Sequence, residues 1–318
     1  MDGKSFVKFA VIKPGLSLQA GAGVNAVFHI TYIAGKFRIF CKAALCWGVG
    51  AKGALGIEVN IKEIGTFFEA FVIMLRNCDY QKMADLASDD AFKSLTILPI
   101  LALSAGVQSG ELMYKTIGKL VDEFPSADQL LNDLSGVIEA AERRRNLMNS
   151  INANPDLLKF TTPETKGTII ATLIENNFID RVDWRNDNLD ASTLNFYKVG
   201  VMKLRKQAVF NSLKWIQSKK DYENVMQHLS LSPGSVTGSW ETNQDRVITF
   251  LAEGEHSWMG IFSTQYAEKL LWLYERLPDG SSINPNDPLV PIPQDYMDQY
   301  LALIDEQDSV SENGKMTA

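Results

Sequence analysis

A chain of 318 residues with 46% hydrophobic side chains can bury a large core, which excludes an intrinsically disordered protein. The formal net charge of −7 argues against wholesale nucleic-acid binding, and the three cysteines lack the spacing of a metal finger. The charge is uneven, because residues 1–60 carry seven Lys or Arg against two acids, a balance of +5 that leaves −12 for the rest. Lys8 and Lys13 interrupt the apolar N-terminal stretch, so we expect no signal peptide.

The first sixty residues alternate between apolar and polar side chains. Apolar residues occupy even positions over 24–32 and odd positions over 37–47, with a turn at Ala34 and Gly35 between them, and a third run at 49–60 again favours odd positions. A period of two is typical of strands, and a tight turn between two such runs predicts a hairpin. We therefore expect an antiparallel meander over residues 5–60, with its inner face built from Phe37, Ile39, Leu45, Leu55 and Ile57.

Two glycine-alanine stretches within this segment resemble each other. "AGAGVNAVFH" at 20–29 and "GVGAKGALGI" at 48–57 follow the similar strings "GKSFVKF" at 3–9 and "GKFRIF" at 35–40. The repetition predicts equivalent hairpins with a period of about thirty residues. Hairpins of this kind serve either as a sheet with one face on a helical body or as a membrane-inserting β-ribbon.

From residue 61 the apolar period becomes helical. The first helix has one apolar stripe, and the uncharged run at 95–107 predicts a buried core helix, since it is shorter than the roughly 20 residues of a membrane span and contains a proline. Ser126 with Gln129 forms a capping-box signature, and Thr162 before Pro163 predicts a second helix start. A long helix from Asp190 to about residue 219 and helices around 244–253 and 257–277 complete an all-α body.

The sequence thus predicts an α+β fold in three parts. Residues 1–60 form the Gly-rich antiparallel β-repeat segment, and residues 61–277 form a larger all-α helical domain. Residues 278–318 are expected to hold a proline-rich connector, a short helix over 294–304 and a disordered acidic tail.

Motifs for common chemistries are not found. The chain has no P-loop, no dinucleotide fingerprint in the right context and no HExxH, so no cofactor or metal site is predicted. The string "AEGEHSW" brings together Glu255, His256 and Ser257 as an acid, a base and a hydroxyl. Adjacent residues point in different directions, so they cannot form a triad by themselves, and a helix-capping loop is the alternative role.

Two cationic clusters are candidate binding surfaces. Lys36, Arg38 and Lys42 alternate with the apolar positions, which predicts an outward face that associates with an anionic partner.

The second cluster, Arg143, Arg144 and Arg145 in "AERRRNL", is expected on the open side of an amphipathic helix. It is either a solvated face balanced by Glu139 and Glu142 or a site for an acidic partner or a phosphate.

The strings "GKFRIFCKAALCWGVGAKGALGIEVN" and "AERRRNLMNSINANPDLLKFTTPETKGTIIATL", joined by an amphipathic helix, resemble the C-terminal region of large proteobacterial proteins associated with type VI secretion and polymorphic toxins. The resemblance implies the terminal module of a bacterial effector, made in the cytoplasm and delivered to a neighbouring cell. Such a module is an interaction or packaging platform for an adaptor, immunity or secretion component, or a membrane-active, pore-forming toxin. A hydrolase-type toxin with residues assembled from distant helices is a further alternative.

Overall fold

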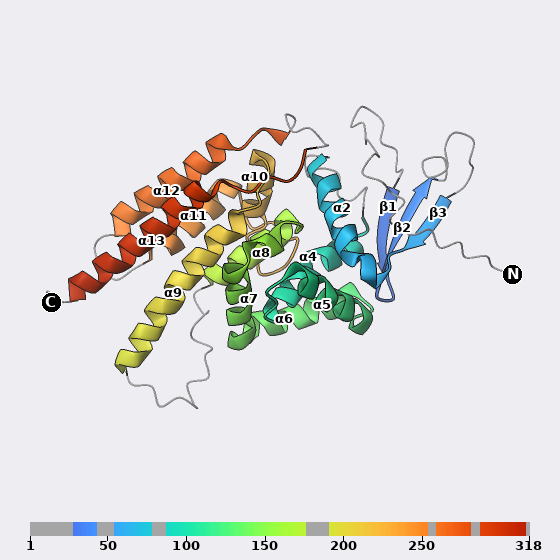
Figure 1. The fold of residues 1–318 in the computed structure, drawn as a ribbon, viewed down its shortest axis with the longest axis horizontal. Coiled ribbons are helices and arrows are strands. Elements are labelled where there is room, and N and C mark those ends of the chain that lie inside the picture. Colours follow the sequence, from blue (N-terminus) through green and yellow to red (C-terminus); the bar gives the residue numbers. More distant parts are fainter. Residues whose placement is uncertain are drawn as a thin grey trace.

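The computed structural model describes residues 28–42, 54–77, 87–175, 191–253, 259–280 and 287–315. A small antiparallel sheet lies at one end of an elongated helical body, and α12 and α13 lie toward the other end (Figure 1). The predicted α+β class is therefore confirmed. The predicted hairpin repeat rests largely on residues 1–27 and 43–53, which lie outside the described part of the chain.

The sheet is formed by β1 (Phe28–Ile33), β2 (Lys36–Lys42) and β3 (Ala54–Glu58) in the order β1-β2-β3. Ala34 and Gly35 both adopt positive φ angles, 52° and 71°, as a two-residue hairpin turn of type I′ requires. Gly35 is also needed for packing, since a Cβ atom there would lie 2.5 Å from the carbonyl oxygen of Val121. The backbone N–H of Ser88 donates to the Ile30 carbonyl at 2.8 Å and so meets the edge of β1.

One face of the sheet packs on the helical body. Ile30, Tyr32, Phe37 and Ile39 are between 0 and 4% exposed, as the alternation predicts for these positions. Helix α2 (Ile64–Asn77) meets them with a stripe that is also buried as predicted: Ile64, Phe67, Phe68, Phe71 and Leu75. The inner face is thus buried against helices, while Leu45 and the side chains of Leu55 and Ile57 fall outside the described residues.

Ten further α-helices follow in the described residues. They are α4 (Asp89–Ser104), α5 (Gly110–Glu123), α6 (Ala127–Glu139), α7 (Ala141–Ala153), α8 (Pro163–Ile174), α9 (Ala191–Leu213), α10 (Lys219–Gln227), α11 (Trp240–Ala252), α12 (Met259–Arg276) and α13 (Gln294–Lys315). Short 3-10 turns occur at Ile61–Glu63 (η2) and Pro155–Leu158 (η3). The capping box of Ser126 and Gln129 starts α6, and Thr162 caps α8, so both predicted helix starts are confirmed.

Two predicted helix ends are wrong. Helix α9 stops at Leu213, where the Lys214 carbonyl instead accepts from Ile292 N at 2.8 Å, and Ser218 starts a separate helix by capping α10. Helix α13 continues to Lys315, so the short helix and disordered tail are corrected over residues 305–315. A further turn of α13 packs inward, because Gln307 is buried beside the core.

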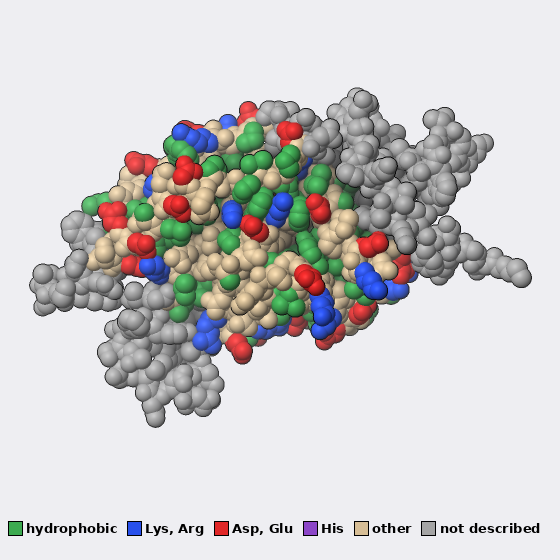
Figure 2. Space-filling view, viewed as in Figure 1, with side chains coloured by type: hydrophobic (Ala, Val, Ile, Leu, Met, Phe, Trp, Pro, Cys, Tyr) green, Lys and Arg blue, Asp and Glu red, His purple; other side chains and the backbone are tan. Residues whose placement is uncertain are grey.

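A single hydrophobic core runs from Ile30 to Ile304, through the sheet, the central helices and α13. The proposed divisions at residues 60 and 277 therefore mark changes of secondary structure within a continuous core. On the face shown in Figure 2, acidic and basic side chains are interspersed, with hydrophobic side chains scattered among them. Within the described residues, no helix has both the length and the apolarity that crossing a membrane requires.

Candidate functional site

Several charged side chains of the helical body are buried, which is costly unless they are paired or hydrogen-bonded. They are Arg76, Arg144, Glu164, Lys166, Arg205, Lys206 and Asp221. Most of the cations bind carbonyl groups near helix ends. A mixed cluster of acids and bases lies between α8 and α10.

Buried cations bind the carboxyl ends of three helices. Arg205 donates from Nε to the Leu173 carbonyl at 2.7 Å and from Nη2 to the Glu175 carbonyl at 2.8 Å, which closes α8. Arg144 donates from Nη1 to the carbonyl of Ile138, in the last turn of α6. The last carbonyls of a helix lack intrahelical partners and carry partial negative charge, so these contacts stabilise the helix ends.

Lys206 links three elements at the end of α11. Its ammonium group donates to the Glu253 carbonyl at 2.6 Å and to Gln307 Oε1 of α13 at 2.7 Å, and Gln307 Nε2 donates back to the Ala252 carbonyl. Tyr266 of α12 donates to the same Gln307 oxygen at 3.1 Å. Burial lowers the pKa of Lys206 to about 8, against the opposing effect of nearby carboxylates. The lysine therefore anchors α13 to the body and titrates near neutral pH.

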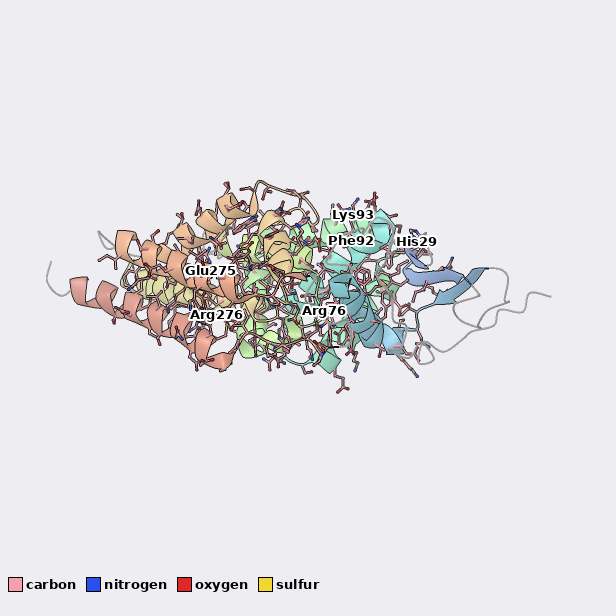
Figure 3. The ribbon with its side chains drawn as sticks, turned by 90° about the horizontal axis from the view of Figure 1, so that it is seen from above. His29, Arg76, Phe92, Lys93, Glu275 and Arg276 are labelled. Atoms are coloured by element: carbon pink, nitrogen blue, oxygen red, sulfur yellow. The ribbon has the colours of Figure 1, made fainter. Side chains whose placement is uncertain are left out.

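A cation and aromatic rings support the docking of α13 from the outside. The Arg276 guanidinium carbon lies 3.3 Å from the ring centroid of Trp272, whose ring stacks on Tyr296 at 3.9 Å. Figure 3 shows Arg276 beside Glu275 on α12, with Arg76 on α2 toward the sheet. Cation–π and stacking contacts of this kind strengthen packing between helices, and they hold the start of α13 against α12.

The mixed cluster forms around the first turns of α8. This helix crosses the centre of the body, so every residue from Pro163 to Leu173 is buried, polar ones included. Gly167 lets α10 come close, since a Cβ atom there would lie 2.6 Å from the carbonyl oxygens of Val225 and His228. The close approach brings Glu164 and Lys166 next to the ionisable groups of α10.

The geometry of the cluster is defined by four ionisable groups. Glu164 Oε1 lies 4.0 Å from His228 Nε2, and His228 Nδ1 is 2.8 Å from the Asn224 carbonyl. Lys166 donates to the Thr161 carbonyl at 3.1 Å, and Asp221 accepts from the backbone N–H of Gln217 at 2.9 Å. The carboxylates of Glu164 and Asp221 both act electrostatically on Lys166.

Burial perturbs both charged residues of α8. It raises the pKa of Glu164, against the opposing effect of His228, and it lowers the pKa of Lys166, against the two carboxylates. Perturbed acids and bases mark functional sites as well as structural networks. His228 engages both ring nitrogens, one with Asn224 and one facing Glu164, so the arrangement suits the storage of a proton better than activation of a nucleophile.

Among the described residues, no group of three or more His, Cys, Asp or Glu side chains could hold a metal ion. Neither the cysteines at 46 and 78 nor the histidine at 256 belongs to this part of the chain. The predicted acid and base Glu255 and His256 likewise lie in the segment 254–258, outside the described residues.

The first predicted cationic cluster lies on the outer face of the sheet. Lys36 Nζ is 2.5 Å from Glu58 Oε1 and Arg38 Nε is 3.8 Å from Glu58 Oε2, with 52% and 40% of the two cationic side chains exposed. Their partner is thus a carboxylate of β3, within the sheet. The backbone of Lys42 continues β2, and its side chain is outside the described part.

The second predicted cluster does not form one open face. Arg144 is 2% exposed, so its predicted surface position is wrong, because α7 turns this residue toward the end of α6. Arg143 makes a two-point contact with Asp133 of α6, at 2.9 and 2.8 Å, and not with the expected acids of the adjacent turn. Arg145 is partly exposed. The three arginines therefore point in different directions.

Sequence reasoning missed the cluster of Glu164, Lys166, Asp221 and His228. These residues come from two helices and belong to no motif, and the polar half of α8 was expected to face solvent. One signal was present: Gly167 interrupts a run of good helix formers, and a glycine inside a helix often has a packing reason.

Comparison with protein-family models, with curated proteins and with solved structures finds no match to this chain.

Proposed function

We propose that this chain is an interaction module that offers the outer face of its sheet to a protein partner with an acidic surface. The observation that carries the proposal is the contrast between the two faces of the sheet. The inner face is covered by helices, whereas Lys36 and Arg38 lie on the opposite face. An antiparallel sheet with one packed and one polar face is suited to act as a platform.

The packing of the inner face favours a platform over a pore. Phe37 packs against Tyr32 at 4.9 Å and Phe67 at 5.1 Å between ring centroids. A membrane-inserting ribbon would have to leave these rings and bury the same face in lipid. The contacts with the helices would then be lost, so the sheet is better suited to remain on the body.

The outer face keeps its cations available for exchange. Glu58 is the single carboxylate near both Lys36 and Arg38, and an exposed ion pair contributes only about 0–1 kcal/mol. An acidic partner can therefore replace Glu58 at little cost. Charges of this kind increase the association rate and its salt dependence more than they change stability.

The wider role follows from the resemblance to type VI secretion-associated proteins. In that role the module is the terminal part of a bacterial effector, and its partner is an adaptor, immunity or secretion component. The test of the platform does not depend on which of these partners is correct.

The proposal is tested with poly-L-glutamate as a probe for an acidic partner. Reversing three charges on β2, Lys36→Glu, Arg38→Glu and Lys42→Glu, should weaken binding at low salt by at least about tenfold. The matched control makes the same change in net charge at three exposed lysines of α4 and α5: Lys93→Glu, Lys115→Glu and Lys119→Glu.

The control should bind as the wild type does. Equal weakening by both variants would mean that the probe reads net charge alone, which contradicts a specific face. Dye release from phosphatidylglycerol vesicles by the wild type would favour the membrane-active alternative instead.

A further inference from the structure

We propose that Glu164 of α8 and His228 at the end of α10 hold one proton between them while these helices are packed, and release it when the helices separate. The interface between α8 and α10 is then a proton-linked joint inside the helical body. Its state depends on pH through two residues that the sheet and its partner do not contact.

The geometry confines the proton to this pair. His228 Nδ1 is committed to the Asn224 carbonyl at 2.8 Å, so Nε2 is the ring nitrogen that faces Glu164, at 4.0 Å from Oε1. Glu164 Oε2 is buried and has no hydrogen-bond partner among the described residues. An ionised carboxylate with so few donors is unfavourable in a protein interior, unless the neighbouring imidazole carries a proton.

Counting charges in the cluster gives the same result. With Lys166 charged, two ionised carboxylates and a neutral imidazole leave a net charge of −1. One proton on Glu164 or His228 makes the cluster neutral, and a second makes it +1. Buried groups with uncompensated charge are costly, so the packed cluster favours a single proton on the pair.

The elements around the pair do not change this count. Asp221 comes from α10, and α4 contributes Thr96, whose carbonyl accepts from Thr165 at 3.0 Å. The cations Arg144 and Arg205, from α7 and α9, lie at the far end of α8, where Arg205 binds the Leu173 carbonyl.

The sign of the pH effect follows from the separated state. Burial raises the pKa of Glu164 in the packed protein. In water a glutamate ionises near pH 4.3 and an imidazole near pH 6.5, so above about pH 6.5 the separated pair has lost the proton. The packed pair still holds it. Raising the pH therefore favours separation, by up to about tenfold in the equilibrium constant per pH unit.

The experiment compares urea unfolding of wild type and Glu164→Gln at several pH values above about 6.5. The variant keeps the shape of the side chain and removes its ionisation. The ratio of the wild-type to the variant unfolding constant should rise with pH, approaching about tenfold per unit. Glu268→Gln on the exposed face of α12 is the control, and its ratio should stay flat.

Parallel pH profiles for wild type and Glu164→Gln would overturn the proposal. If that variant fails to fold, proton release on thermal unfolding is measured by calorimetry in buffers of different ionisation enthalpy. The wild type should release about one proton more than His228→Gln at slightly alkaline pH. Equal release by the two proteins would also overturn it.

Discussion

Replacing Phe37 by alanine tests whether the sheet is fixed to the helical body. The side chain is 1% exposed and its ring lies 4.9 to 6.4 Å from the rings of Tyr32, Phe67 and Phe68. Removing a buried phenylalanine loses the transfer free energy of the ring and leaves a cavity, at a cost of about 3–5 kcal/mol. The three ring contacts place Phe37→Ala toward the upper part of this range, at about 4 kcal/mol.

The assay is urea unfolding, combined with hydrogen exchange of the β1 and β2 amides. Hydrogen exchange is needed because the sheet could open separately from the helices. Lys36→Ala is the matched control, since it is the preceding residue of β2 and points outward to Glu58. Its expected cost is below about 1 kcal/mol. A cost of Phe37→Ala no larger than that of the control would refute the platform, because the inner face would then not be committed to the helices.

Three further outcomes are expected. Gly167→Ala should destabilise the protein by about 1–3 kcal/mol, since its Cβ would meet two backbone carbonyls at 2.6 Å, whereas Gly110→Ala, with no atom within 4 Å, should be neutral or stabilising by urea unfolding. Because burial lowers the pKa of Lys206 to about 8 from an ordinary 10.5, the unfolded chain binds more protons in this window, and the unfolding free energy should rise with pH by up to about 3 kcal/mol. Lys206→Met should lose that rise, and denaturation at two alkaline pH values detects the difference. The double reversal Lys36→Glu and Arg38→Glu should change the free energy of unfolding by less than about 1 kcal/mol, and a larger loss would assign these cations a structural role.

Features that depend on near neighbours in the chain were predictable. The hairpin of β1 and β2 follows from alternation around Ala34 and Gly35, whose positive φ angles suit a two-residue turn. The start of α6 follows from Ser126 and Gln129, which bond to each other's backbone three residues apart. Periodicity identified the buried stripe of α2, because burial repeats with the helix period.

The candidate site could not be predicted in the same way. Glu164 and His228 are distant in sequence, and they meet because Gly167 removes the Cβ that would hold α10 away. Arg144 reads as a surface residue within an Arg-rich run, yet the end of α6 lies over it and supplies a carbonyl. No local pattern records either approach.

The sequence by itself determined which segments alternate, which are helical and where several of them begin, because these features depend on side chains within a few residues of one another. Only the tertiary structure decided which polar residues are buried. Helix α8 illustrates the difference: its sequence allows an exposed polar side, but neighbouring helices surround it from Pro163 to Leu173. Once surrounded, Glu164 and Lys166 must find partners inside the protein, since the cost of burying a charge depends on every element packed around it.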